Sequence, residues 1–478
     1  MFPFPFYFSL PEYKPYQQRV INRVNNPQGP HGIIAYHSMG SGKTLTSLGA
    51  MDRALKEHPG QRGLFVVPAS LVDNIYKEMD KHGFDDMRPR VDVMSYEKAA
   101  RHAAELASRH YAMSVFDEAH RLRNTGTQRA KNLQQVIDNS GKVLMLTGTA
   151  GYNHPADMAS LVNIINPKEG LPTGYNEFED IYVNRKDWTL KNQNDLSRRM
   201  QPYMDMYRRP VDDSAYPAVD RRIVNVEMSP QQADLYRAVA NKDVPWRLRN
   251  KMRRNLPMSL RESRMLNMYS TGVRQVSVSP MHHDIHATYQ DSPKINVATS
   301  HMTELARTVP GFRGVAYSNF LDAGIRPYVE SLRAQGITPL VLTGNMNQKQ
   351  KKQVVDAYNE KTPDPRVLVI SSSGGEGLDL KRTNLLQILD PHFNNAKLAQ
   401  VEARAVRYKS HEGLPKDQQR VIIEEYRSLL PRTMWQTMTF NPADTSIDTK
   451  LSELAARKQS VINQMDSMMM GAQARMPN

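Results

Sequence analysis

The chain has 478 residues, no cysteine and a formal net charge of +14 at pH 7, with an isoelectric point of about 9.6. The lack of cysteine excludes disulfides, cysteine-ligated zinc and thiol catalysis and predicts an intracellular, reducing compartment, while the lack of any run of about 18 uncharged apolar residues predicts no membrane association. The length predicts two or three domains, and the positive charge makes nucleic acid the expected polyanionic partner.

From residue 10 to 180, short apolar runs alternate with helical stretches. These runs are GIIAYHS (32–38), GLFVVPAS (63–70), YAMSVFDEAH (111–120) and KVLMLTGTA (142–150). Each run ends in a small or polar loop, which is typical of a parallel α/β sheet with its functional groups at the carboxyl ends of the strands. We therefore predict an N-terminal α/β domain over this range.

The remaining chain divides into three zones. Residues 181–294 are polar and rich in arginine, which predicts a basic, mainly helical insertion or linker. Strand-like runs return over 295–440 and predict a second α/β domain; they are GFRGVAYSNF (311–320), ITPLVLTGN (337–345), PRVLVISSSGGEG (365–377) and NLLQILDPH (384–392). Residues 441–478 are expected to form a helix and a frayed tail.

A phosphate-binding loop is predicted between the first strand and the helix that follows it. The pattern G-x-x-x-x-G-K-[ST] is met by Gly42, Lys43 and Thr44, but His37 stands where the first glycine belongs. Gly40 adds conformational freedom nearby. Backbone N–H groups of residues 40–44 can therefore still face phosphates, with Lys43 neutralising them and Thr44 ligating Mg²⁺.

An acidic pair follows a later strand of the same domain. Asp117 is expected to hold Mg²⁺, and Glu118 to orient and deprotonate the attacking water. His120 is placed to relay the state of the site. An Asp-Glu pair is also common in the first turn of a helix. The catalytic interpretation of this pair therefore depends on the phosphate loop that precedes it in the sequence.

These motifs, in this order, resemble the superfamily 2 helicase-like ATPases. GKT, DEAH and LTGT (146–149) are followed by SSSGGEGLDL (371–380), which resembles motif V, and QVEARAVR (400–407), which resembles motif VI. Similarity to the Swi/Snf-type branch is carried by KPYQQRVINRV, VVPASLVDNIYKEM and SIDTKLSELAARK. The stretch RYKSHEGLPKDQQRVIIEEYRS is similar to helicases and early transcription factor ATPases of large DNA viruses. Ala150 departs from the proline usual after Thr149.

The resemblance implies two RecA-like P-loop lobes with parallel sheets that bind ATP and Mg²⁺ between them, joined by the basic helical insertion. It implies roles for nucleotide-binding groups beyond the phosphate loop: Gln17 on adenine, Gly375 of motif V near the nucleotide, and Arg404 and Arg407 on the developing charge. Without this resemblance, the two arginines could equally be residues on the solvent-exposed face of a helix. If the protein is viral, its compartment is the host cell or the virion.

Nucleic-acid contacts are expected mainly with phosphates, because a motor must cross any sequence. The resemblance points to side chains at strand ends, namely Ser70, Thr147, Ser318 and Thr343. A second candidate surface is the segment 242–274, which carries nine lysines and arginines against two acidic residues, and includes Arg253 and Arg254 in WRLRNKMRRN. Each strand-end residue could instead be an ordinary turn residue. The segment 242–274 could instead be a basic helix that faces solvent.

The sequence therefore predicts a nucleic-acid-dependent ATPase that moves along DNA. Strand separation and tracking along duplex both remain open, as does RNA in place of DNA. Two alternatives are the motor of a restriction system and an ATPase-fold subunit that docks in the transcription or replication machinery. The cluster MHHDIH (281–286) imitates a metal site, but nothing fixes a tetrahedron there, so Mg²⁺ with ATP is the only metal expected.

Overall fold

The computed structural model describes residues 11–148, 154–185, 187–210, 215–372, 378–391, 395–439 and 441–475. The chain forms two compact units, one of Met1–Val211 with Lys458–Asn478 and the other of Asp212–Arg457. Each unit is built around a six-stranded sheet whose strands all pair in parallel. The predicted fold class, two parallel α/β units, is confirmed.

The sheet of the first unit has the strand order β3-β2-β4-β5-β1-β8. Its strands are β1 (Gly32–His37), β2 (Gly63–Val67), β3 (Val91–Ser95), β4 (Met113–Asp117), β5 (Lys142–Thr147) and β8 (Met204–Tyr207). Every residue of β1 and β2 is buried. The near-continuous apolar runs of the sequence are therefore strands that are covered on both faces.

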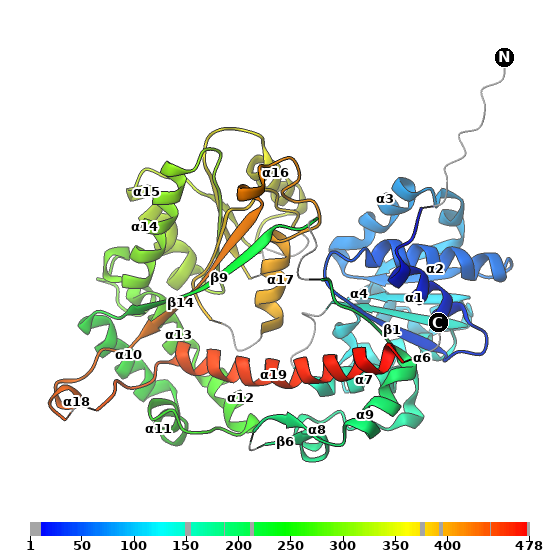
Figure 1. Ribbon diagram of the computed structural model, residues 1–478, viewed down its shortest axis with the longest axis horizontal. Helices are drawn as coiled ribbons and strands as arrows, with labels where there is room; N and C mark the ends of the chain where they lie inside the picture. Colours follow the sequence, from blue (N-terminus) through cyan, green and yellow to red (C-terminus); the bar gives the residue numbers. More distant parts are fainter. Residues whose placement is uncertain are drawn as a thin grey trace. The chain divides into compact units, whose positions relative to one another are not determined.

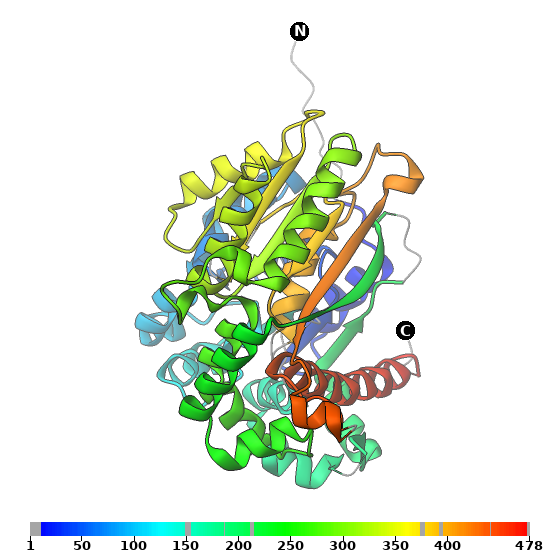
Figure 2. The same cartoon turned by 90° about the vertical axis from the view of Figure 1, so that its left-hand side faces the viewer.

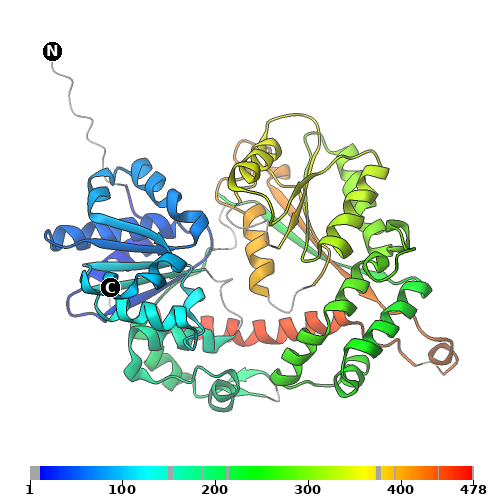
Figure 3. The same cartoon turned by 180° about the vertical axis from the view of Figure 1, so that it is seen from behind.

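Helices cover the two faces of this sheet, as Figures 1 and 3 show from opposite sides. Ile33 and Ala35 of β1 pack on one face, whereas Ile34 and Tyr36 pack on the other, as the two-residue period of a strand requires. The first face is covered by α1 (Pro15–Asn25), α2 (Lys43–Glu57) and α3 (Val72–His82). The second is covered by α4 (Tyr96–Arg101), α5 (Ala103–Ser108), α6 (Gln128–Asp138) and α7 (Pro155–Ile165).

The second face also receives elements from distant parts of the sequence. They are α8 (Tyr175–Tyr182), the antiparallel pair β6 (Val183–Asn184) and β7 (Thr189–Leu190), α9 (Gln193–Met200), and the part of α19 (Ile447–Gln473) that begins at Lys458. Val461, Met465 and Met469 recur at helical spacing and enter the core of this unit. The part of the C-terminal helix from Lys458 onward is thus part of the first unit's core.

The sheet of the second unit has the order β11-β12-β10-β13-β14-β9. Its strands are β9 (Ala218–Glu227), β10 (Arg313–Ser318), β11 (Leu340–Leu342), β12 (Arg366–Ser371), β13 (Leu385–Ile388) and β14 (Arg420–Leu429). Figure 2 shows β9 running along β14, and the two strands pair from Ala218 opposite Arg420 to Glu227 opposite Leu429.

Three layers of helices complete this unit. One sheet face packs on α14 (Pro293–Thr308) and α15 (Arg326–Ala334), and the other on α16 (Gln348–Asn359) and α17 (Asn395–Ala405). A separate helical core, which also takes in the first residues of α19, is formed by α10 (Pro230–Asp243), α11 (Trp246–Arg253), α12 (Leu260–Tyr269) and α13 (Thr271–Val278). The short helix α18 (Met434–Met438) follows β14.

The segment 181–294, predicted as an insertion, does not stand apart from the two units. Residues up to Val211 belong to the first and residues from Asp212 to the second. The segment is mainly helical from 230 onward, as expected, but it also supplies β8 and β9, which are strands of the two sheets. Among the described residues, no helix combines the length and the apolar character needed to cross a membrane.

A buried ion pair joins three elements of the second unit and gives a test of its packing. Lys294 Nζ lies 2.6 Å from Asp448 Oδ2, with the two side chains 0% and 2% exposed. Lys294 also donates to the Leu389 carbonyl, and Asp448 accepts from the Ser428 backbone N–H. Asp448→Ala leaves a buried ammonium without its partner, so we expect the free energy of unfolding in urea to fall by about 3–5 kcal/mol.

The matched control removes an exposed pair. Arg53 and Glu57 on α2 are 43% and 41% exposed, and Glu57→Ala should change the unfolding free energy by no more than about 0.5 kcal/mol. A combined Lys294→Met and Asp448→Leu variant should be more stable than Asp448→Ala, because neither charge is then left buried alone. Equal effects of Asp448→Ala and Glu57→Ala would contradict the packing argument.

Candidate functional site

The loop between β1 and α2 has the backbone form of a phosphate cradle. Gly40 has φ = 78° and Gly42 has φ = 77°, in the left-handed region that favours glycine. A Cβ on Gly42 would lie 2.6 Å from Gln17 Nε2, so a side chain at this position would also displace the end of the Gln17 side chain. These two turns let α2 begin at Lys43, where the unpaired N–H groups of its first turn form a natural anion site.

Lys43 is held at the mouth of this loop. Its Nζ donates to the carbonyls of His37 and Ser38 at 3.3 and 3.4 Å. A Cβ on Gly148, just after β5, would lie 3.7 Å from the same Nζ, which places Gly148 beside the loop. Burial lowers the pKa of Lys43, whereas the nearby Glu118 and Asp117 carboxylates favour its charged form. An anionic ligand would therefore stabilise the ammonium further.

The acidic pair lies where β4 ends. The Glu118 backbone N–H donates to Asp117 Oδ1 at 3.0 Å, and Glu118 adopts φ = 54°, which is uncommon for a residue with a side chain. Burial and then the Glu118 charge raise the pKa of Asp117 to about 6. Burial also opposes ionisation of Glu118. His120 Nδ1 lies 3.2 Å from Glu118 Oε2, however, and the pKa of Glu118 is lowered overall by this neighbour. The neighbouring carboxyls thus differ in proton affinity, as an acid–base site requires.

Gln17 and Tyr16 of α1 brace the loop from outside. Gln17 Nε2 donates to the carbonyls of Ser41 (3.2 Å) and Gly42 (3.3 Å), and the Tyr16 hydroxyl donates to Ser41 O at 2.8 Å. Both side chains are buried. The structure therefore brings Gln17, Gly42 and Lys43 together in one unit, whereas the adenine contact assigned to Gln17 stays a prediction.

His37 has a structural place that the sequence did not indicate. Its Nε2 lies 2.9 Å from Oδ1 of Asp205, a fully buried residue of β8 that also pairs with Arg19 (2.8 Å) and Arg23 (3.1 Å) of α1. We call these four residues the Asp205 cluster. Burial opposes the charge of Asp205, but His37 and Arg19 lower its pKa to about 2.

The Asp205 cluster explains why a histidine is accepted at the start of the loop. The His37 side chain is only 1% exposed and serves to hold β1, β8 and α1 together. Burial lowers its pKa, with Asp205 acting in the opposite direction, so the imidazole is neutral at neutral pH. The spacing of Arg19 and Arg23 on one face of α1 was the available signal for this cluster.

The predicted arginines lie in the second unit. Arg404 is in the last turn of α17, and Arg407 follows that helix. Arg407 Nη1 donates to the Leu378 carbonyl at 2.9 Å and to Asp379 Oδ1 at 3.2 Å, which places it against the end of motif V. Gly375 lies outside the described residues. The catalytic roles of Arg404 and Arg407 stay predictions.

The predicted strand-end contacts to nucleic acid differ in accessibility. Ser70 is exposed in a short turn (Ala69–Leu71) after β2, and Thr343 is half-buried after β11. Thr147 ends β5 and is buried, and its hydroxyl has no hydrogen-bond partner among the described residues. Ser318 ends β10 and is also buried, with its Oγ accepting from the Phe320 N–H at 3.1 Å.

Arg253 and Arg254 lie at the end of α11 in the second unit, and both are exposed. Exposed cations are available to a polyanion without any rearrangement, as is Ser70. The buried hydroxyls of Thr147 and Ser318 would need a local opening. All six nucleic-acid contacts stay predictions.

Comparison with known proteins gives three family matches. The profile described as the SNF2-related domain matches residues 85–281, and that of the helicase conserved C-terminal domain matches residues 300–409. The profile described as the type III restriction enzyme, res subunit, matches residues 10–152. Together these matches span residues 10–281 and 300–409, which include the phosphate loop, the acidic pair and motif VI.

Two of the similar proteins come from large DNA viruses. A protein of Acanthamoeba polyphaga mimivirus, named as a candidate ATP-dependent RNA helicase, is 28% identical over 466 residues, which are 96% of this chain and 97% of that protein. A termination factor NPH-I homologue of African swine fever virus is 24% identical over 497 residues, 83% and 69% of the two chains. Among solved structures, the Sulfolobus solfataricus SWI2/SNF2 ATPase core in complex with duplex DNA is 18% identical and covers 97% of this chain and 96% of its own, with a TM-score of 0.39.

The geometry of the loop predicts the effect of a single methyl group. Gly42→Ala should strain the left-handed backbone and displace Gln17, at a cost of about 1–3 kcal/mol. We expect the affinity for a fluorescent ATP analogue, measured by titration, to fall by about tenfold or more. Gly60→Ala is the control, because a Cβ there meets nothing within 4 Å. Wild-type affinity in Gly42→Ala would show that this backbone form is not needed.

The Asp205 cluster predicts a pH dependence of stability. Because the pKa of His37 is lowered from 6.5 by burial, the stability that its neutral form contributes is fully present above pH 6.5 and is lost as the pH falls below that value. His37→Gln keeps an N–H donor for Asp205 but gains no proton. Between about pH 7 and pH 5, the unfolding free energy of the wild type should therefore fall more steeply than that of His37→Gln. Parallel curves in urea denaturation would contradict this role.

Proposed function

Because the chain belongs to the SNF2-related, helicase-like ATPases, we propose that it is a motor that hydrolyses ATP to move along nucleic acid, with DNA as its track. One observation supports this more than any other. Lys43, Asp117 and Glu118 interact electrostatically beside a glycine loop at the end of a buried parallel sheet. Such a constellation serves phosphoryl transfer to water.

The residues present suit ATP and Mg²⁺. The N-terminal N–H groups of α2 and the Lys43 ammonium receive the phosphates. The Thr44 hydroxyl and the Asp117 carboxylate are the oxygen ligands that Mg²⁺ prefers, and bound Mg²⁺ would supply charge neutralisation of the phosphates. Glu118, whose pKa is lowered overall by its pairing with His120 despite burial, is ionised and can accept a proton from the attacking water.

Arg404 and Arg407 carry a second part of the proposal. In phosphoryl-transfer enzymes, an arginine that stabilises the transition-state charge contributes about 10³–10⁵ in rate. Arg407 is oriented by the Leu378 carbonyl and Asp379, so its guanidinium is positioned before any ligand arrives. Under this proposal, Arg407→Ala loses hydrolysis while the affinity for ATP changes little.

The named relatives favour a role in viral transcription, in the host cell or the virion. One is named as a termination factor homologue and another as a candidate RNA helicase, so RNA is the alternative track. A second candidate function, an ATPase-fold subunit that acts as a docking module, would not require ionisable groups matched to hydrolysis. A restriction-system motor is a third candidate, supported by the match over residues 10–152.

The rate of ATP hydrolysis tests the proposal directly. We expect the purified chain to hydrolyse ATP faster with duplex DNA than alone, measured by phosphate release with single-stranded DNA, duplex DNA and RNA in parallel. Lys43→Ala should abolish turnover by weakening ATP binding. Glu118→Gln should retain ATP binding but lose about 10²–10⁴ in rate, because the base for the attacking water is removed.

The pattern of stimulation separates the candidates. Preference for a single strand would favour strand separation, and preference for RNA would move the function to transcripts. No turnover of ATP with any nucleic acid would contradict the motor and leave the docking module. Equal activity of Glu118→Gln and wild type would show that another group serves as the base.

A further inference from the structure

A pocket of about 340 Å³ lies in the helical core of the second unit; part of the basic stretch WRLRNKMRRN (246–255) lines it, but none of the ATPase motifs does. Its walls come from α10, α11, the end of β14 and the segment before α19. It is lined by Tyr236, Arg237, Ala240, Asn241, Trp246, Arg249, Asn250, Met252, Arg253, Leu430, Asp444 and Thr445. Its volume is in the range of small-molecule sites.

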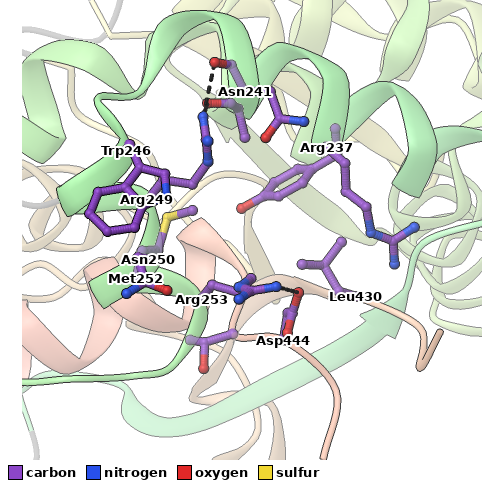
Figure 4. A pocket seen from close by; sticks show the side chains of 12 residues that line it. Arg237, Asn241, Trp246, Arg249, Asn250, Met252, Arg253, Leu430 and Asp444 are labelled. Atoms are coloured by element: carbon purple, nitrogen blue, oxygen red, sulfur yellow. Dashed lines mark hydrogen bonds and ion pairs between the residues drawn. The ribbon is translucent and has the colours of Figure 1, made fainter. Parts of the chain in front are cut away.

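The pocket combines a closed apolar floor with an open aromatic side chain. Tyr236 and Met252 are each 2% exposed and Leu430 is 5% exposed, so these side chains belong to the packed core. Trp246, the first residue of α11, is 68% exposed. Figure 4 shows Trp246 and Arg237 on opposite sides of the pocket. A flat ring could enter between them and stack on the indole.

The polar groups of the pocket are mostly cationic. Three arginines line it against one acidic residue, Asp444, whose Oδ2 is 4.0 Å from Arg253 Nη1. Arg249 is fixed by donating to the Asn241 carbonyl at 2.9 Å. Arg237 pairs with Asp234, but its Nε is buried and has no hydrogen-bond partner among the described residues. A buried N–H donor without a partner is unusual, and this one could donate a hydrogen bond to an acceptor atom of a bound ligand.

Positive charge continues outside the pocket along α11. Lys242, Arg247 and Arg254 are exposed on this helix and its flanks, and the nearby Lys251 is already paired with Glu262 at 2.7 Å. A free nucleotide would need only the pocket, whereas a strand would also contact the exposed cations. The arrangement of one aromatic side chain, two side-chain amides and a row of cations is that of a single-strand binding surface.

We propose that this pocket takes up one unstacked base of a nucleic-acid strand, with the base on Trp246 and the flanking phosphates on Arg253, Arg247 and Arg254. The inference rests on the proposed function in one respect, that nucleic acid is the track. Asn241 and Asn250 can meet the edges of any base, so the site tolerates all sequences. The pocket lies in a different unit from the phosphate loop. It would bind one nucleotide of a nucleic-acid strand and is not a second site for ATP.

The test is equilibrium binding of a fluorescent oligothymidylate to the full chain, measured by anisotropy without ATP. Trp246→Ala removes an exposed side chain, so the fold is expected to persist. Loss of one stacking contact should weaken binding by roughly 5- to 150-fold. Trp435→Ala is the matched control, because Trp435 is 65% exposed on α18 and does not line the pocket; its affinity should stay within about twofold of wild type.

Two further measurements separate stacking from charge. On a strand of equal length with abasic sites, Trp246→Ala should bind as the wild type does, because there is no base to stack. Arg253→Gln should reduce the slope of log affinity against log salt by about 0.7, whereas Trp246→Ala should leave the slope unchanged. Arg326→Gln on α15, where the side chain is 65% exposed, is the matched control for charge.

Each other outcome overturns the inference. Wild-type affinity in Trp246→Ala would show that the strand does not use the pocket. Mononucleotide binding that depends equally on Trp246 would assign the pocket to a free nucleotide. Displacement of the strand by an oligoglutamate peptide from the wild type, but not from Trp246→Ala, would assign it to an acidic protein. If the wild type bound no nucleic acid and nucleic acid did not stimulate ATP turnover, the proposed function would fail as well. If nucleic acid stimulated turnover but Trp246→Ala bound the strand as tightly as the wild type, only this inference would fail.

Discussion

The central strands of both sheets are buried on their two faces, and this burial determines where chemistry can take place. A parallel strand covered on both sides can carry few polar side chains along its length, so polar groups gather at its ends. In parallel sheets the carboxyl ends of the strands share one edge. In the first unit β1 is followed by the phosphate loop, β4 ends at Asp117 and β5 at Thr147. In the second unit β10 ends at Ser318 and β12 at Ser371.

The same burial explains how the phosphate loop tolerates His37. A histidine at the end of a fully covered strand must find hydrogen-bond partners inside the protein, because an unpaired buried imidazole would be costly. Asp205 supplies the acceptor, and Arg19 and Arg23 compensate its charge. The turn itself depends on Gly40 and Gly42, which alone in this loop adopt positive φ. The missing first glycine therefore changes what supports the loop while leaving its backbone form intact.

The sequence was a good guide wherever one short segment contained the whole signal. Asp117 ends β4, and Gly42 and Lys43 follow β1 in the loop and the first turn of α2, because apolar runs and loop residues adjoin in the chain. Strand β9 was not predictable in this way. Most of its residues are exposed and it carries Asp220, Arg221 and Arg222, so it resembles a polar linker, and only its pairing with β14 makes it a strand. Asp205 gave no local signal either, since its partners lie on α1 and β1, far away in the sequence.

The basic segment 242–274 shows how composition overstates surface charge. Lys251 is paired with Glu262, Arg274 is buried 3.6 Å from Asp390, and Arg249 is held by backbone carbonyls at the end of α10. These cations stabilise the helical core and add little to its attraction for a polyanion. Four exposed cations, Lys242, Arg247, Arg253 and Arg254, lie on α11 and its flanks beside Trp246, and Arg264 is exposed on α12. Four of the segment's exposed cations therefore surround one helix, where an aromatic side chain can add short-range contact to long-range attraction.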